Sequence, residues 1–345
     1  MQVLVCSQPQ HLELQEFDYP DCSPGHAVVR IRRIGVCGTD IHAYGGNQPY
    51  FQYPRVLGHE LAGEVVEVAD EQSAQLVGKQ AYVIPYLHCG ECRACQMGKT
   101  NCCQNMQVIG VHKDGGMAEY LAVPTTHLVV SETLNLDQLA LVECMAIGAH
   151  AVRRSAIQPG ELAVIVGAGP IGMGVLQVAK SQGARTLMLD TNTARLAFCR
   201  DVLGADAIAT PQETTTAALI SELNDGALAD VVFDATGSPR AMQAGFDLVG
   251  HGGRYVLVSV VKADISFSDP DFHKKELTLM GSRNATPEDF AQVTSLMETG
   301  EIKVEAMITH RARLADAASQ MPQWCDPSHQ VIKAMISIDP EEVLV

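Results

Sequence analysis

The sequence has few aromatic residues, few basic residues and no long hydrophobic run. Aromatic side chains make up 5% of the chain, with a single Trp, so aliphatic residues and Met must fill the core. Lys and Arg number 24 against 40 Asp and Glu, and the formal charge of −16 argues against a basic surface for nucleic acid or anionic membranes. No apolar run approaches the roughly 18–20 residues of a membrane span, and residues 1–6 lack the features of a secretory signal. We therefore expect a cytoplasmic protein that binds neither nucleic acid nor membrane.

Hydrophobic residues make up 47% of the chain, as in a well-packed globular protein. Its length of 345 residues suits about two domains. Over residues 1–145, short apolar runs alternate with turn residues such as Pro24-Gly25, a pattern typical of β-structure. Residues 146–282 instead alternate strands with helices, which predicts βαβ units and a parallel sheet. We expect the tail, residues 283–345, to return to the first domain. The predicted fold class is α/β, with a β-rich domain and a doubly wound domain.

A glycine-rich turn lies near the start of the second domain. Gly167, Gly169 and Gly172 have the G-x-G-x-x-G spacing after an apolar run, and Pro170 and Ile171 open a predicted helix. Glycines at this spacing let a pyrophosphate approach the free N–H groups of a helix N-terminus. The turn therefore predicts a dinucleotide site.

Three further residues bear on that cofactor. Asp190 ends the next predicted strand, where a carboxylate binds the ribose hydroxyls of NAD and repels the 2′-phosphate of NADP. Arg195 could instead bind the 2′-phosphate of NADP, so NADP stays an alternative cofactor. Asp190 could also be a solvent-exposed residue at a strand end with no role in binding. Thr236 follows another strand at the edge where the cofactor is expected, although a loop turn explains it equally well. NAD is the favoured cofactor.

Five of the eleven cysteines fall within residues 89–103. Four of them, with the spacing C-x2-C-x2-C-x7-C, can close a tetrahedral zinc site without an open position, which suits a structural metal. These are Cys89, Cys92, Cys95 and Cys103. Cys102 is adjacent to Cys103, so the spacing leaves the fourth ligand open.

A second group of metal-ligating residues is scattered along the chain. Cys37, the pair His59 and Glu60, and Glu143 supply one thiolate, one imidazole and one or two carboxylates. Such a mixed set suits a zinc that keeps a position for substrate or water. The alternative is an ordinary surface or core pair of His and Glu.

The chain resembles the zinc-dependent medium-chain dehydrogenases of the alcohol, sorbitol and threonine dehydrogenase type over essentially its full length. The resemblance is carried, in order, by Cys37-Gly38-Thr39-Asp40, Gly58-His59-Glu60, the four-cysteine segment and the glycine-rich turn. It implies a GroES-like β-rich catalytic domain of residues 1–145 and 283–345, and a Rossmann NAD-binding domain of residues 146–282. It also implies a homodimer or homotetramer.

The resemblance assigns roles to the candidate metal ligands as well. It implies a catalytic zinc on Cys37, His59 and Glu60, with Glu143 as a further ligand or as the group that holds the zinc-bound water. The family spacing favours Cys103 as the fourth structural ligand, which gives two zinc ions per chain. Cys144 follows Glu143 where a Pro is usual, a departure that bears on the geometry of Glu143.

Within the family, several segments resemble the branch that oxidises a hexonate at its C5 hydroxyl; these are residues 45–49, 53–60, 273–276 and 280–290. The expected reaction is the NAD-dependent oxidation of L-galactonate, or a related hexonate, to the keto acid D-tagaturonate. A neutral polyol of the sorbitol or idonate type, or L-threonine, is the alternative substrate. A catalytically silent nucleotide-binding relative is a third hypothesis, which the intact ligand set disfavours.

Two residues near Cys37 are candidates for proton transfer. Thr39 is close enough in sequence to take the substrate proton, and His42 could pass it through the cofactor ribose to solvent. The alternatives are a turn hydroxyl and a surface histidine.

A sugar acid needs a cation for its carboxylate. Arg283 offers a planar bidentate fork, and His112 with Lys113 form a second candidate pair, although each is equally a surface charge. Tyr44 and Asn47 are candidates for bonds to the sugar hydroxyls.

Overall fold

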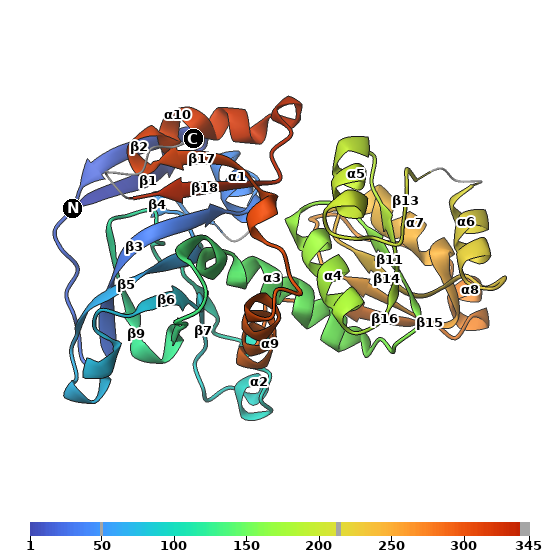
Figure 1. Cartoon of the computed structure of the whole chain (residues 1–345), viewed down its shortest axis with the longest axis horizontal. Helices are drawn as coiled ribbons and strands as arrows, with labels where there is room; N and C mark the ends of the chain where they lie inside the picture. The colour runs from blue at the N-terminus through green and yellow to red at the C-terminus, as the bar shows by residue number, and fades with distance from the viewer. Residues whose placement is uncertain (49–50, 212–214, 339–345) are drawn as a thin grey trace. The chain divides into compact units, whose positions relative to one another are not determined.

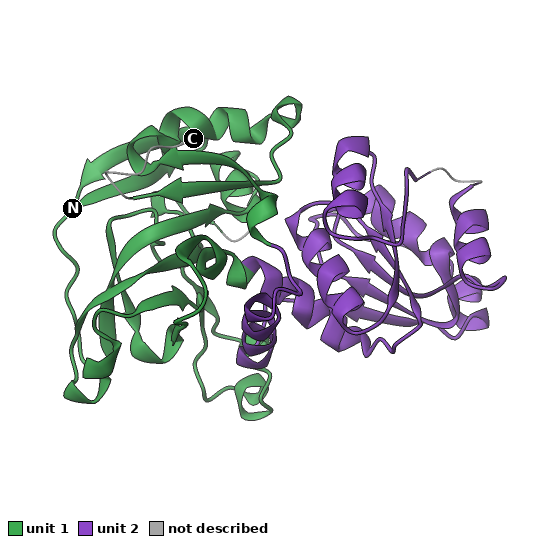
Figure 2. Cartoon of the chain, in the orientation of Figure 1, with its two compact units in different colours: residues 1–143, 304–345 green, residues 144–303 purple. Residues whose placement is uncertain are grey.

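The computed structural model describes residues 1–48, 51–211 and 215–338. Pro49, part of the 45–49 segment noted above, lies outside the described residues. The chain divides into two compact units, drawn in green and purple in Figure 2. Unit 1 comprises Met1–Glu143 and Val304–Val345, and unit 2 comprises Cys144–Lys303.

Unit 1 is built on a seven-stranded sheet in the order β10-β6-β5-β3-β18-β17, with β9 also paired to β3 (Figure 1). All its pairings are antiparallel except that of β17 with β18. The strands are β3 (His26–Val36), β5 (Glu60–Val68), β6 (Gln80–Val83), β9 (Tyr120–Pro124), β10 (Leu128–Val130), β17 (Ile308–Arg313) and β18 (Lys333–Ser337). Because β18 pairs with β3, the C-terminal segment completes the sheet that the N-terminal segment begins.

Smaller elements complete unit 1. Strands β2 (His11–Glu16), β1 (Gln2–Gln8) and β4 (Arg55–Val56) form a second sheet, and β7 (Tyr86–Leu87) pairs with β8 (Gln107–Val108). The helices are α1 (Gly38–Tyr44), α2 (Arg93–Gln96) and α10 (Leu314–Cys325), with short 3-10 turns at Glu71–Leu76, Thr100–Cys102, Thr125–His127, Glu305–Met307 and Pro327–His329. The core between these elements consists mainly of Val, Leu, Ile and Ala, as the scarcity of aromatic residues requires.

Unit 2 has one six-stranded parallel sheet in the order β13-β12-β11-β14-β15-β16. Its strands are β11 (Leu162–Val166), β12 (Arg185–Leu189), β13 (Ala207–Ala209), β14 (Ala229–Asp234), β15 (Val249–Leu257) and β16 (Thr278–Gly281). Its helices are α4 (Pro170–Ser181), α5 (Thr193–Asp201), α6 (Thr216–Leu223), α7 (Pro239–Leu248), α8 (Asp269–Lys274) and α9 (Pro287–Glu298), and α3 (Leu136–Ser155) begins in unit 1 and ends in unit 2. In order of appearance the strands run 3-2-1-4-5-6, the doubly wound arrangement that binds dinucleotides. The predicted α/β fold class is confirmed.

Residues 283–303 belong to unit 2 by their contacts, whereas the sequence assigned them to the first domain. Asp289, in the first turn of α9, explains this grouping. Its carboxylate lies 2.9 Å from Nδ1 of His150 and accepts bonds of 2.6 and 3.0 Å from Arg153, both on α3. These bonds to a fully buried carboxylate attach α9 to the part of α3 that belongs to unit 2.

Within the described part of the chain, no helix combines the length and the apolar character needed to cross a membrane.

Candidate active site and zinc sites

The loop after β3 positions Cys37 through a buried carboxylate. Cys37 is the N-cap of α1, and Asp40, three residues later, accepts the backbone N–H of Cys37 at 2.9 Å. The second oxygen of Asp40 accepts the N–H of Gly58 at 3.1 Å, so one fully buried side chain ties together the two loops that carry Cys37 and His59. Burial raises the pKa of Asp40, although these N–H donors and His59 act in the opposite direction. The sequence analysis gives Asp40 no role beyond its place in the family motif; its capping-box spacing from Cys37 is the signal that predicts this one.

Cys37, His59 and Glu60 converge in unit 1. Each offers one ligand atom, and the three atoms lie within 4.8 Å of one another. Nδ1 of His59 is buried without a hydrogen-bond partner, and a carboxylate oxygen of Asp40 lies 3.8 Å from it. One sulfur, one nitrogen and one oxygen donor, with a carboxylate behind the imidazole, fit the set that binds a catalytic zinc.

The negative charges around His59 shift its pKa in the opposite direction to burial. Burial lowers the pKa of this imidazole, but the Cys37 thiolate and the Asp40 carboxylate raise it well above its ordinary value. A metal ion at this site must therefore displace protons, and zinc binding weakens as the pH falls.

Glu60 has a partner that the sequence analysis missed. Lys333 on β18 is 1% exposed, and its Nζ donates to both oxygens of Glu60, at 2.6 and 2.7 Å. The signal was available, because Lys333 is the one charged residue in the apolar run 331–338. A lysine in a buried strand needs a buried partner.

Glu143 also lies in this buried region, but it is not among the three converging ligands. Its carboxylate accepts a short bond from the hydroxyl of Tyr86 on β7, and both side chains are buried. Burial raises the pKa of Glu143, and His59, Glu60 and Lys333 are its charged neighbours. Burial and the Glu143 carboxylate together raise the pKa of Tyr86 well above its ordinary value. Tyr86 is a second residue that the sequence analysis missed, and its isolated position carried no signal.

The other candidates near Cys37 differ in exposure. Thr39 lies partly exposed in the first turn of α1, and His42 is exposed in its last turn. Tyr44 is 9% exposed and packs in the hydrophobic core of unit 1, which leaves little of it for a substrate. Asn47 is exposed, and its backbone N–H donates to the carbonyl of His42 at 2.8 Å.

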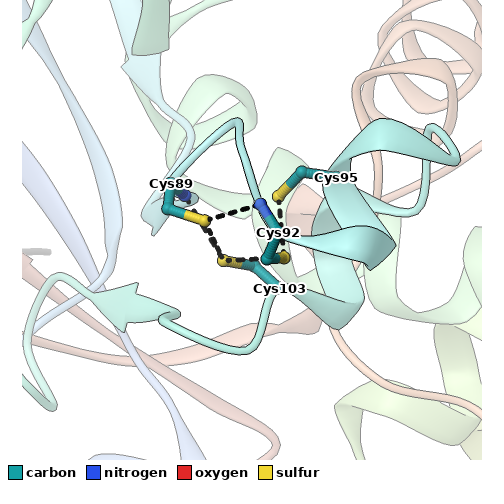
Figure 3. Close-up of side chains that lie close together, drawn as sticks. All are labelled: Cys89, Cys92, Cys95 and Cys103. Carbon is teal, nitrogen blue, oxygen red and sulfur yellow. Dashed lines mark hydrogen bonds between the residues drawn. The ribbon is translucent and has the colours of Figure 1, made fainter.

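The four-cysteine segment forms a separate cluster, shown in Figure 3. The Cys92 and Cys95 sulfurs are 3.5 Å apart, as are those of Cys89 and Cys103, close to the roughly 3.8 Å expected for tetrahedral bonds of ~2.3 Å to zinc. Hydrogen bonds from backbone N–H groups, mainly those of Gln104 and Cys95, lower the pKa of Cys92 to about 6. The set is therefore prepared for a structural metal.

The structure also distinguishes the two adjacent cysteines that the spacing left open. The Cys103 thiol is buried in the cluster and accepts the backbone N–H of Cys89 and of Asn105, each at 3.3 Å. Cys102 is exposed and outside the cluster.

This difference gives a matched pair of variants. We expect Cys103→Ser to remove about one zinc ion per chain and to lower the melting temperature, because a structural zinc contributes directly to folding. Cys102→Ser should change neither. Elemental analysis for zinc and thermal unfolding measure both effects, and equal zinc loss in the two variants would contradict the assignment.

The glycine-rich turn in unit 2 has the geometry of a dinucleotide site. A Cβ on Gly172 would lie 1.8 Å from the carbonyl oxygen of Gly167, so this close packing requires glycine. A Cβ on Gly169 would meet no atom within 4 Å, which leaves room for a ligand at the N-terminus of α4, where Pro170 and Ile171 open the helix. Asp190 accepts the backbone N–H of Ala168 at 2.5 Å, so it lies beside this turn.

The remaining cofactor candidates have local partners. The Thr236 hydroxyl donates to Asp234 at 3.0 Å, and Asp234, fully buried at the end of β14, was not predicted. Arg195 lies in the first turn of α5, where its backbone N–H donates to the side chain of Asn192 at 3.1 Å.

The cationic substrate candidates are spread over both units. Arg283 is exposed in unit 2, just after β16. Lys113 is exposed in unit 1, and the neighbouring His112 accepts the backbone N–H of Val108 at 3.0 Å. The bond from Val108 fixes the His112 ring within its own loop.

Comparison with known protein families identifies the class of enzyme. Residues 23–133 match the model of the alcohol dehydrogenase GroES-like domain, and residues 170–299 match that of the zinc-binding dehydrogenase. The chain therefore belongs to the zinc-binding alcohol dehydrogenase family. The predicted family, its zinc dependence and the dehydrogenase activity are confirmed.

Individual relatives narrow the comparison. The chain is 45% identical to L-galactonate-5-dehydrogenase of Escherichia coli (strain K12), covering 98% of this chain and 99% of that protein. It is 33% identical to the 2-dehydro-3-deoxy-L-galactonate 5-dehydrogenase of Pseudoalteromonas atlantica, covering 92% and 93%. Its fold matches that of an Escherichia coli CFT073 alcohol dehydrogenase solved with NADH, with a TM-score of 0.92, 27% identity and coverage of 98% and 99%.

Proposed function

We propose that the protein oxidises the C5 hydroxyl of L-galactonate, or of a related hexonate, to the keto acid D-tagaturonate, with NAD as hydride acceptor. The observation that carries this proposal is the convergence of Cys37, His59 and Glu60, a set of donors that binds a zinc in an alcohol dehydrogenase. The 45% identity to an L-galactonate dehydrogenase supports the substrate.

The chain's own residues suit this chemistry. A zinc held by Cys37, His59 and Glu60, with Glu143 beside them, would supply Lewis acidity toward the substrate hydroxyl. The Thr39 hydroxyl would accept the substrate hydroxyl proton while giving up its own, and His42, exposed on the same helix, would pass a proton to solvent. NAD, when bound, would supply the acceptor for the hydride of the oxidised carbon.

The cofactor assignment rests on unit 2. The open space at Gly169 and the free N–H groups at the start of α4 suit a pyrophosphate, which agrees with the NADH complex of the CFT073 relative. The Asp190 carboxylate beside the turn suits the ribose hydroxyls of NAD and disfavours the 2′-phosphate of NADP. Gly167, Gly172, Pro170 and Ile171 would shape the turn. Thr236, whose side chain lies against Gly167, and Arg195 are the further cofactor candidates.

The substrate residues belong to the same proposal. The carboxylate of a hexonate would pair with Arg283, with His112 and Lys113 as the second choice. Asn47, and with less exposed surface Tyr44, would contact hydroxyl groups. We also propose a cytoplasmic homodimer or homotetramer, which light scattering of the purified protein would test.

A substrate panel tests the function. NADH formation, followed by absorbance, should be at least about tenfold faster in kcat/KM with L-galactonate than with other aldonates, sorbitol or L-threonine, a difference of roughly 1.4 kcal/mol in transition-state binding. Higher activity on sorbitol or threonine than on every aldonate would overturn the substrate assignment.

The Arg283→Ala variant tests whether Arg283 binds the substrate carboxylate. This variant should raise KM for the aldonate by roughly tenfold or more, because it removes a charge-assisted bond, and leave KM for a neutral polyol nearly unchanged. An equal rise for both substrates would exclude a carboxylate contact.

A further inference from the structure

Lys333 makes an ion pair that is unusual for its burial. It is 1% exposed and Glu60 is fully buried, yet both oxygens of Glu60 lie within 2.7 Å of the Lys333 ammonium, which also donates to the Val36 carbonyl at 3.3 Å. Taking two charges out of water costs several kcal/mol per ion unless the pair is well bonded. Neighbouring apolar strand residues would fill this volume at lower cost, so the pair calls for a reason beyond packing.

The backbone is arranged to let the pair form. Glu60 on β5 stands opposite Gly35 on β3, and Gly35 in turn stands opposite Met335 on β18. A Cβ on Gly35 would lie 2.1 Å from a carboxylate oxygen of Glu60. The glycine therefore leaves the gap through which Glu60 reaches across β3 to a lysine two strands away.

The acidic side chains of the zinc site explain why a buried lysine is paired with Glu60. Asp40, Glu60 and Glu143 are buried carboxyl side chains around this site, and Cys37 adds a partly buried thiol group. Counted as ionised, the four groups carry a charge of −4. A divalent ion would leave −2 of that charge uncompensated, and the Lys333 ammonium balances the unit that Glu60 contributes.

We propose that Lys333 is a positioning residue of the catalytic zinc site. It holds the Glu60 carboxylate beside Cys37 and His59 by both oxygens, across the gap at Gly35, and its ammonium balances the negative charge of that carboxylate. The C-terminal segment thus provides part of the active site, although it contributes no ligand. The inference rests on the proposed alcohol oxidation only for its kinetic readout; the metal readout is independent of the substrate.

The test uses the full chain with cobalt(II) in the catalytic site, whose visible absorption bands report ligand number and geometry. We expect Lys333→Met and Gly35→Ala to change the positions or intensities of these bands, because each releases Glu60 from its fixed orientation. Lys333→Arg should keep most of the wild-type spectrum. The matched control is Lys79→Met, which removes an exposed lysine paired with Glu132 in the same unit. Wild-type bands in both Lys333→Met and Gly35→Ala would overturn the proposal.

A double variant covers the case in which Lys333→Met does not fold. Glu60→Gln together with Lys333→Met removes both charges and leaves no buried ion unpaired. If Lys333 acts through Glu60, the cobalt spectrum of the double variant should equal that of Glu60→Gln alone. A clear further change in the double variant would show that Lys333 does not act through Glu60 and would overturn the inference.

The kinetic readout is the pH profile of kcat/KM. Loss of one positive charge beside a zinc ligand should make the substrate proton harder to remove and move the profile to higher pH by about one to two units. Lys333→Arg should restore the wild-type profile, which a merely structural role would not require. If no alcohol in the panel is oxidised, the proposed function fails, whereas the cobalt spectra still decide the role of Lys333.

Discussion

His59→Ala is expected to lower kcat/KM for the alcohol oxidation by about 10³-fold or more and to remove one of the two zinc ions. The imidazole is one of three converging donors at the catalytic site, and its loss leaves a thiolate and a carboxylate. Lewis acidity is worth several kcal/mol, and ~4 kcal/mol corresponds to about 10³ in rate. Elemental analysis and steady-state kinetics measure the two effects together.

Two comparisons make this result specific. His11→Ala removes an exposed histidine from a surface pair with Glu13 and should leave both zinc content and rate unchanged. Thr39→Val should keep both zinc ions and still lower turnover sharply, because only the proton acceptor is lost. A His59→Ala protein with full zinc content and normal turnover would remove His59 from the ligand set.

The second large effect concerns the stability of unit 2. Asp289→Asn is expected to lower its stability by about 3 kcal/mol, or roughly 6–12 °C in the melting temperature of that unit. The fully buried carboxylate accepts bonds from Arg153 at 2.6 and 3.0 Å and from the backbone and hydroxyl of Thr286, both at 2.8 Å. An amide cannot accept all of these bonds. Thermal or urea unfolding at pH 7 measures the loss.

The effect should depend on pH in a definite direction. Burial favours a raised pKa for Asp289, but the bonds from His150, Arg153 and Thr286 outweigh it and hold the pKa well below its ordinary value. The carboxylate therefore stabilises the fold fully above about pH 4, the ordinary range of an unfolded Asp, and progressively less as the pH falls below it. The difference between wild type and Asp289→Asn should shrink in that acid range.

A matched control separates this network from a general effect of removing an acidic residue. Asp316 occupies the third position of α10, as Asp289 does in α9, but it is paired with Arg313 at the surface. Exposed pairs contribute at most about 1 kcal/mol. Similar losses of stability in Asp316→Asn and Asp289→Asn would therefore contradict the role assigned to the buried network.

Local spacing made much of the molecule predictable. The glycine-rich turn and the helix that starts at Pro170 lie where the sequence placed them. In each case residues a few positions apart decide the geometry, because a helix N-terminus or a tight turn involves one short stretch of backbone. The same holds for Cys89, Cys92 and Cys95, which short spacings bring to one cluster.

Other features depended on a resemblance to known proteins. Cys37 and His59 come from different loops; their residue types make them candidate ligands, and the resemblance to the family is what assigns them to one zinc site. Asp40 supplies the physical link, because one buried carboxylate accepts an N–H from each loop. The grouping of residues 283–303 likewise depends on side-chain bonds from α9 to α3 that hydrophobic patterns do not encode.

What the sequence by itself determined is the family, the two metal-binding sets and the dinucleotide turn. Only the tertiary structure decided which groups support them: Lys333 against Glu60, Tyr86 against Glu143, and Cys103 rather than Cys102. The physical reason is that these contacts join residues far apart in the sequence. Lys333 and Glu60 are 273 residues apart, and their contact depends on the register of three strands and on the missing side chain of Gly35. Strand register is a property of the whole sheet, so no local pattern in the chain specifies it.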